Sequence, residues 1–332
     1  MNTPPTDGIR VPAERMRAFV RELMRTAGLV DDKAALLADL LVANDLRGVH
    51  SHGTRQAATY AGLIADGMLN GRPDVRKVAE HEAMATFDGD GGLGYFPSHD
   101  AAQWIIGPAR RHGVAVALTR NHGHFGAAGI YSRIIVAADL IAYVTSGHQL
   151  VWRPGQSVRA AAGGSPMSFG VPGGREPALL LDFGTMIDLG AGFPRAAELF
   201  GIAPGLVIRN VGLGMVCQAL GGFLAGVPMD EERAVKEYRG ANQGALIVAI
   251  DPARFISLET LKAEMDRYQA RVREMAPLSP TTPAMVPGAL EVERERSYGR
   301  EGIPVGARHR EALEVAARRF GVPSPFPDDP AP

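Results

Sequence analysis

The sequence predicts an α/β fold that follows a helical N-terminal region, and two periodicities carry this prediction. From about residue 75, short apolar runs alternate with helical stretches, which is the pattern of a sheet covered by helices. Before that point, apolar residues recur at spacings of three and four, as in amphipathic helices. The 332 residues contain no internal repeat and suffice for one large domain or two intimate ones.

Three helices are expected in the first 66 residues, over 11–28, 32–46 and 54–66. Gly28 ends the first helix, and Asp31 and Asp32 can cap the second. The segment 47–55 therefore falls on a turn between two helices. This region could also serve as a helical cap or as an oligomerisation element.

Five strands are expected farther along the chain, over 83–87, 114–119, 140–145, 178–181 and 246–250. Helices are expected between and after them, over 98–111, 127–138, 258–273 and 308–320. This alternation favours an α/β sheet. The last residues, 322–332, are rich in proline and are expected to form a loose tail.

Composition excludes several classes of function. The formal net charge of -1 gives no reason to expect a nucleic-acid or anionic-membrane partner. The single cysteine, Cys217, excludes an intrachain disulfide and a cysteine-rich metal site. The first ten residues are polar and do not resemble a signal peptide. The most apolar run, 211–228, holds five glycines and is shorter than a membrane span, so a cytoplasmic protein is expected.

Two histidine-bearing segments concentrate the chemistry. Residues 47–55 read Arg-Gly-Val-His-Ser-His-Gly-Thr-Arg, and residues 120–129 read Arg-Asn-His-Gly-His-Phe-Gly-Ala-Ala-Gly. Each places proton-transfer, hydroxyl or cationic groups beside glycines, where a ligand could approach the backbone closely. A single histidine is more often a surface or core residue than a ligand-binding one. Two segments with matching chemistry favour a functional site.

Two other patterns in the sequence point to different kinds of site. Gly89, Gly91 and Gly94 match the glycine spacing of a dinucleotide-binding loop, but no acidic residue follows at the position that would bind the ribose. A Rossmann fingerprint is therefore not expected. The His-x-His spacings 50–52 and 122–124 could hold a metal, but few carboxylates lie nearby, so no metal is expected.

Together with Asp88–Gly94 and Ala241-Asn242-Gln243-Gly244, the histidine segments resemble the malate/L-lactate dehydrogenase family, which is unrelated to Rossmann-type enzymes. This family includes ureidoglycolate dehydrogenase, sulfolactate dehydrogenase and the piperideine-2-carboxylate reductases. The resemblance is close over 10–147, weak over 148–215 and clear again to about 320. It implies an α/β cofactor domain over 76–299, with a mixed sheet of non-Rossmann type. A helical substrate-side domain would combine 1–75 with 300–325.

The resemblance also implies the reaction and the residues that perform it. It implies hydride transfer between NAD or NADP and a small 2-oxo or 2-hydroxy acid, or a cyclic imino acid, in a homodimer. The catalytic residues would be His124 as proton donor, with His52 and Ser51. Arg55 and Tyr60 would bind the substrate, although the family usually carries this arginine at the position of Gln56. The cofactor would be held by Ser51, His52, His122, Gly126, His148, Ser165, Asp182, Phe183, Gly184, Arg209 and Gly288.

The chain departs from the family mainly on the cofactor side. The family's Gly-Thr-Asn-Pro turn is Gly163-Gly164-Ser165-Pro166 here, and a Pro-Thr-Thr-Asp-Pro signature is absent. The family's glycine loop with a cofactor-contacting lysine becomes 207–212, with Arg209 at the lysine position and a helix expected over 211–224. Two alternatives therefore stay open. One is a non-redox isomerase or lyase that uses His52 and His124 for proton transfer, and the other is a non-catalytic ligand-binding protein.

Overall fold

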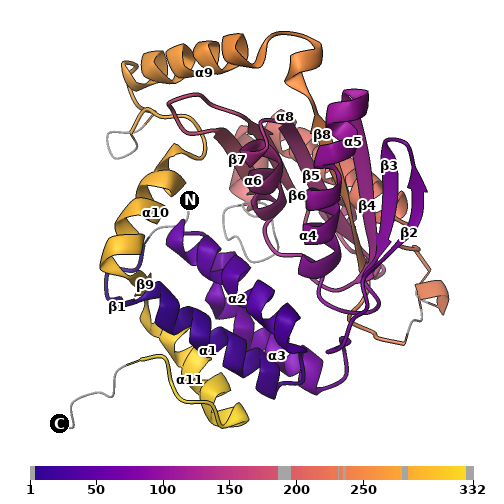
Figure 1. The fold of residues 1–332 in the computed structure, drawn as a ribbon. Coiled ribbons are helices and arrows are strands. Elements are labelled where there is room, and N and C mark those ends of the chain that lie inside the picture. Colours follow the sequence, from indigo (N-terminus) through magenta and orange to yellow (C-terminus); the bar gives the residue numbers. More distant parts are fainter. Residues whose placement is uncertain (1–3, 186–195, 231, 235–236, 279–282, 327–332) are drawn as a thin grey trace. The chain divides into compact units, whose positions relative to one another are not determined.

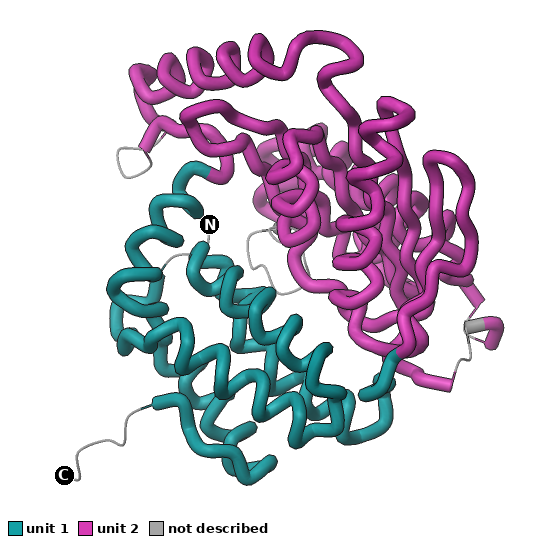
Figure 2. The backbone as a smooth tube through the Cα atoms, in the orientation of Figure 1, with its two compact units in different colours: residues 1–73, 289–332 teal, residues 74–288 magenta. Residues whose placement is uncertain are grey.

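The computed structural model describes residues 4–185, 196–230, 232–234, 237–278 and 283–326. The chain forms two compact units (Figure 2). Unit 1 comprises Met1–Pro73 with Ala289–Pro332, and unit 2 comprises Asp74–Gly288. The domain boundary expected after residue 299 falls inside the helix Ala289–Glu301, which lies wholly in unit 1.

Unit 1 is helical. Its elements are β1 (Ile9–Val11), α1 (Ala13–Thr26), α2 (Asp31–Leu46), α3 (Ala57–Ala65), α10 (Ala289–Glu301), β9 (Ile303–Val305) and α11 (Ala307–Phe320). The expected apolar stripe of α1 is buried, and β1 pairs with β9 in antiparallel fashion, so both chain ends share one core. Between α2 and α3 lie two short 3-10 turns, η1 (His50–His52) and η2 (Thr54–Gln56), which confirm the expected turn.

Unit 2 contains a seven-stranded sheet with the order β2-β3-β4-β8-β5-β6-β7 (Figure 1). The strands are β2 (Arg76–His81), β3 (Met84–Asp88), β4 (Val114–His122), β5 (Ile141–His148), β6 (Pro166–Val171), β7 (Leu179–Gly184) and β8 (Gln243–Ile250). Only the β3–β4 pair is parallel, so the sheet is mixed. The predicted α/β class with a mixed sheet is confirmed.

Helices cover both faces of this sheet. The helices α4 (Tyr95–Trp104), α5 (Ile106–His112) and α6 (Gly129–Ala137) lie on one face (Figure 1). Gly170 of β6 has no side chain, which leaves room for Val136 of α6. On the other face lies α8 (Pro204–Cys217), continued by the π-helix η4 (Gln218–Phe223). Burial of the Tyr143 hydroxyl in β5, reinforced by its contact with Cys217 at the end of α8, raises the pKa of Tyr143 to about 12.

Several elements were not anticipated. The strand β2 is exposed along its whole length, so it carries no apolar alternation to detect. In α10 only Tyr298 is buried, and its many charged residues hide the helical period. The segment 98–111 was expected as one helix, but α4 begins at Tyr95 and α5 follows after Ile105.

The most apolar part of the chain forms a longer helix than expected. The helix extends back to Pro204, and Pro204–Phe223 is long and apolar enough to cross a membrane by length and composition alone. A core helix of a soluble protein passes the same test. Of the tail expected to be loose, residues 322–326 are anchored, because Phe326 is buried and its carbonyl accepts a hydrogen bond from Arg15 (3.0 Å). Residues 327–332 lie outside the described part.

Candidate active site

One edge of the sheet in unit 2 gathers most of the predicted site residues. Gln243, at the start of β8, pairs with His122 at the end of β4 and with His148 at the end of β5. The strands β4 and β5 both run antiparallel to β8, so their carboxyl ends meet at this edge. The register Pro166↔Gly184 brings the start of β6 and the end of β7 to the same edge.

His124 lies on a short loop directly after β4, and the protein fixes this loop tightly. The His124 side chain is half-buried, whereas most of its neighbours are buried. The amide of Gly94 donates a hydrogen bond to the His124 carbonyl (3.1 Å), and the Tyr131 hydroxyl donates one to the Phe125 carbonyl. Gly126 has φ +82°, and a side chain there would collide with Tyr95, which explains the glycine. His124 is thus an accessible imidazole on a rigid support.

His122 has a different environment. It is fully buried, its Nε2 lies 2.8 Å from Thr119 Oγ1, and its Nδ1 lies 2.7 Å from the Gly123 carbonyl. A neutral imidazole satisfies both contacts if Nδ1–H donates to the carbonyl and Nε2 accepts from the hydroxyl. Both ring nitrogens therefore bond within the protein. This geometry holds the loop, and a contact between His122 and a cofactor stays a prediction.

The remaining polar groups at this edge come from three strands. His148 is clamped by Gln218, whose amide accepts from the His148 N–H (3.2 Å) and donates to the His148 carbonyl (2.7 Å). Burial lowers the pKa of His148. Two buried atoms that directly follow β5 and β7, Gln149 Nε2 and Thr185 Oγ1, have no hydrogen-bond partner among the described residues. Buried polar atoms of this kind are normally paired, so a bound polar molecule suits this edge.

Four predicted cofactor residues lie at this edge as well, on the strand ends. Ser165 precedes β6, has φ +45° and donates a hydrogen bond to the Ala162 carbonyl. Asp182, Phe183 and Gly184 end β7, and a side chain added at Gly129 would meet the Asp182 carboxylate. Since Gly129 begins α6, the Asp182 carboxylate lies against the N-terminus of the helix that follows the His124 loop.

Two predicted cofactor residues of unit 2 lie away from this edge. Arg209 was expected in a glycine loop before a helix over 211–224, but α8 already begins at Pro204, and Arg209 is an exposed residue inside it. The loop prediction was wrong because Pro204 starts the helix earlier. Gly288 packs its backbone against Leu180, near the start of β7 and away from the edge where β7 ends.

In unit 1 the first histidine segment is organised by a buried carboxylate. Asp45 of α2 is fully buried and accepts hydrogen bonds from the Thr54 N–H (2.9 Å) and the Thr54 hydroxyl. His50 Nδ1 lies 3.3 Å from the same carboxylate, and His309 Nε2 of α11 lies 3.0 Å from the Thr54 hydroxyl. The Asp45 carboxylate and the side chains that bond to it therefore form one network that stabilises the turn between α2 and α3.

The predicted catalytic residues of unit 1 lie on this turn. Ser51 Oγ lies 2.9 Å from His52 Nδ1, which restricts the imidazole ring. Arg55 is exposed and has no ion-pair partner among the described residues, whereas Gln56 donates to the Ser51 carbonyl (2.7 Å). The exposed guanidinium of this turn is therefore that of Arg55, whereas the neighbouring Gln56 is used within the turn. Tyr60, expected as a second substrate contact, is 2% exposed within α3.

We expect unit 1 to lose stability in mild acid. Burial lowers the pKa of His52 and His309, with Arg55 adding to the effect in both and Asp45 opposing it in His309. As the pH falls through about 6.5, the ordinary histidine pKa, the unfolded chain binds protons before the folded chain does. The free energy of unfolding therefore decreases as the pH decreases. Chemical unfolding at pH 7.5 and 5.5 measures this, and His309→Gln should reduce the difference. If the difference in stability between the two pH values is the same in His309→Gln as in the wild type, His309 is not a cause of the acid sensitivity.

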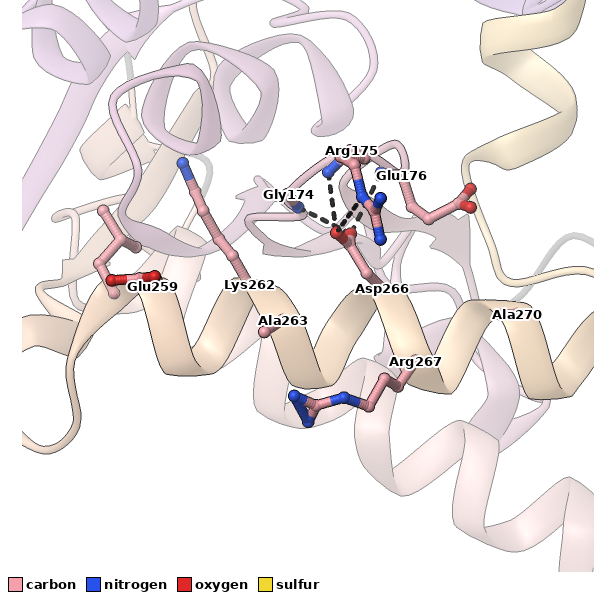
Figure 3. Close-up of a pocket in the computed structure, with 10 residues that line it drawn as sticks. Gly174, Arg175, Glu176, Glu259, Lys262, Ala263, Asp266, Arg267 and Ala270 are labelled. Carbon is pink, nitrogen blue, oxygen red and sulfur yellow. Dashed lines mark hydrogen bonds and ion pairs between the residues drawn. The ribbon is translucent and has the colours of Figure 1, made fainter.

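A separate groove lies at the opposite end of β6 and β7, between the loop 174–176 and α9 (Leu258–Arg273) (Figure 3). It measures about 780 Å³. The Asp266 carboxylate accepts the backbone N–H groups of Gly174, Arg175 and Glu176 at 2.9–3.1 Å, so this contact fastens α9 to the loop. The groove contains no histidine and lacks the unpaired polar atoms of the other edge.

Sequence reasoning missed the residues that support the site. Asp45, His309 and Gln218 were not among the site residues predicted from the sequence. The contacts of His309 and Gln218 join residues far apart in the sequence, so no local spacing reveals them. Among the described residues, no group of three or more His, Cys, Asp or Glu side chains could hold a metal.

The chain also matches known proteins over nearly its whole length. The family model described as malate/L-lactate dehydrogenase matches residues 11–188 and 196–314. The chain therefore belongs to the malate/L-lactate dehydrogenase family, and it is an oxidoreductase.

Individual relatives are distant but cover whole chains. A malate dehydrogenase of Pyrococcus horikoshii is 24% identical over 95% of this chain and 96% of its own. The L-sulfolactate dehydrogenase of Methanocaldococcus jannaschii is 25% identical over 93% of this chain and 96% of its own. The solved structure of the Pyrococcus horikoshii malate dehydrogenase superposes with a TM-score of 0.83, 24% identity, and coverage of 97% of this chain and 98% of that one, which confirms the fold.

Proposed function

We propose that this oxidoreductase transfers a hydride between NAD or NADP and a small 2-oxo or 2-hydroxy acid, or a cyclic imino acid. The observation that supports this most is the half-buried His124, held on a fixed loop at a sheet edge where two buried polar atoms have no partner among the described residues. The named relatives act on malate and sulfolactate, which are 2-hydroxy acids. A delta1-piperideine-2-carboxylate reductase with the same fold supports the imino acid alternative.

The residues at the edge suit a nicotinamide cofactor. Thr185 Oγ1 and Gln149 Nε2 have no hydrogen-bond partner in the described part of the chain and would bond amide and hydroxyl groups, and Ser165 and Asp182 to Gly184 would line the same place. The cofactor, when bound, would supply or accept the hydride. His124 would donate a proton to the substrate oxygen or nitrogen during reduction and take it back during oxidation. His52, oriented by Ser51, would hydrogen-bond the reactants.

Arg55 is proposed to bind the substrate carboxylate, and a conservative substitution tests this. A guanidinium offers two parallel hydrogen bonds that an ammonium cannot reproduce, so Arg55→Lys should raise KM about 10-fold or more, consistent with roughly 1.5–3 kcal/mol for a charged hydrogen bond. The effect should be confined to substrates that carry a carboxylate. Arg72→Lys, the same change at another exposed arginine of unit 1, is the matched control. An equal effect on a decarboxylated analogue would assign Arg55 a structural role.

Cofactor binding separates the proposal from its two alternatives. NADH and NADPH fluorescence would be titrated with the purified protein, followed by reduction assays with oxaloacetate, pyruvate and piperideine-2-carboxylate. Binding with turnover supports the proposal. Arg209 lies outside the loop expected for it, and absence of binding to both cofactors would contradict the proposal.

We also propose that the protein is a cytoplasmic homodimer, as the family resemblance implies. The helix α8 exposes apolar side chains, among them Leu206 and Ile208, and such patches often mark contact surfaces. Light scattering of the purified protein would measure the mass, and a 35.3 kDa species would contradict the dimer.

A further inference from the structure

The glycine-rich segment 88–94 has no role in the reaction proposed above. A strand precedes it and a helix follows it, as in a dinucleotide-binding loop. Its glycines, however, pack against other residues of the protein and leave no room for a ligand at their Cα atoms. A side chain at Gly94 would lie 2.5 Å from His122 Nδ1 and 2.7 Å from the Gly123 carbonyl, and one at Gly89 would lie 2.8 Å from His122 Cβ. These glycines are needed for close packing against the His124 loop.

Backbone hydrogen bonds join the segment 89–94 to residues 120–124 almost residue by residue. Gly89 N–H donates to the Arg120 carbonyl (2.9 Å), and Gly91 N–H donates to the Asn121 carbonyl (2.9 Å). In the next two bonds, Gly123 N–H donates to the Gly92 carbonyl (2.8 Å) and Gly94 N–H donates to the His124 carbonyl (3.1 Å). The segment 89–94 thus continues the parallel β3–β4 pairing beyond the strands, up to His124 itself.

The carboxylate of Asp88 fixes the start of this arrangement. It accepts hydrogen bonds from Asn121 Nδ2 (2.8 Å), from the Asp90 N–H (3.0 Å) and from Arg120 Nε (3.2 Å). Burial alone would raise the pKa of Asp88, but these three donors outweigh it and hold the pKa low. The carboxylate is therefore ionised at neutral pH, and it bonds both to the segment 89–94 and to the end of β4.

The bond to Asn121 stabilises an unusual backbone conformation. Asn121 has φ +54°, in the left-handed region that costs a non-glycine residue of the order of 1 kcal/mol. Asn121 is the last residue but one of β4 and lies at the register shift between Thr119 and His122, directly before the His124 loop. Since Asp88 holds both Arg120 and Asn121, we propose that Asp88, with the glycines of 89–94, is a positioning residue for His124. This inference rests on the proposed function, in which His124 transfers the proton.

Two variants of Asp88 test the inference. Asp88→Ala removes the acceptor, and Asp88→Asn keeps the shape but loses the charge. Misplacing a catalytic group by about 1 Å can cost about 100-fold in rate. We expect kcat for the best 2-oxo or imino acid substrate to fall about 10–100-fold in Asp88→Ala and less in Asp88→Asn, with KM for substrate and cofactor within about twofold. The control is Asp139→Asn, which removes a surface ion pair with Lys262 at another left-handed residue and should leave kcat unchanged.

A double-mutant cycle distinguishes positioning from general damage. If Asp88 acts through His124, Asp88→Ala should lower kcat no further in a His124→Ala background. Full additivity, or wild-type kcat in both Asp88 variants, would overturn the inference.

A second measurement does not depend on activity. The His124 imidazole signal, assigned by its loss in His124→Ala, should shift and titrate differently in NMR spectra of Asp88→Asn, and an unchanged signal would overturn the inference. If His124→Ala were fully active while that signal still shifted, the proposed function would fail and the structural link between Asp88 and His124 would stand.

Discussion

Replacing His124 with alanine is expected to lower turnover by about 10²–10⁴-fold, the usual contribution of a general acid–base group. The imidazole is half-buried, and the hydrogen bonds from Gly94 and Tyr131 go to backbone carbonyls of its loop, so the substitution removes the imidazole and leaves these bonds in place. Cofactor affinity should change little, because the loss concerns proton transfer and not binding. Steady-state kinetics and a fluorescence titration with NADH and NADPH measure the two effects separately.

Two controls sharpen this test. His112→Ala removes an exposed histidine of the same unit and should be neutral. A His122 variant should instead lower stability, since His122 is buried with both ring nitrogens bonded. Near-full activity of His124→Ala would remove His124 from the mechanism and make His52 the principal candidate for proton transfer.

Much of the fold could be predicted from the sequence because its core elements have clear periods. The buried strands β4, β5 and β8 are continuous apolar runs, and α1 has one apolar stripe. The missed elements lack such signals. The strand β2 is fully exposed, and β6 contains Pro166 and Gly170, which weaken a strand pattern.

The site was predictable only in part, for a related reason. His124 and the 50–55 segment were found because short polar motifs beside glycines are visible locally. The supporting groups were not visible, because Asp45 meets His309 across 264 positions of sequence through Thr54, and Gln218 meets His148 across 70. The glycine pattern 89–94 was correctly separated from a Rossmann loop, but its packing against His122 required the three-dimensional structure.

The second large effect is expected from Gly53→Ala, which should destabilise unit 1 by about 3–5 kcal/mol, the cost of disrupting a buried charged network. Gly53 has φ -94°, so its backbone would accept alanine without strain. The added methyl group would instead overlap the Asp45 carboxylate, which is fully buried and bonded to Thr54 and His50. Either the carboxylate moves and loses these bonds, or the turn that carries Ser51 and His52 shifts.

Gly299→Ala is the matched control for this substitution. Gly299 lies in α10 of the same unit with no atom near an added methyl group, so alanine should stabilise the helix by up to about 1 kcal/mol. Urea unfolding of both variants would therefore give changes of opposite sign. A double variant with Asp45→Ala should lose less than the sum of the single losses, because the methyl group then has nothing to displace. A Gly53→Ala protein as stable as the wild type would show that Asp45 does not hold this turn.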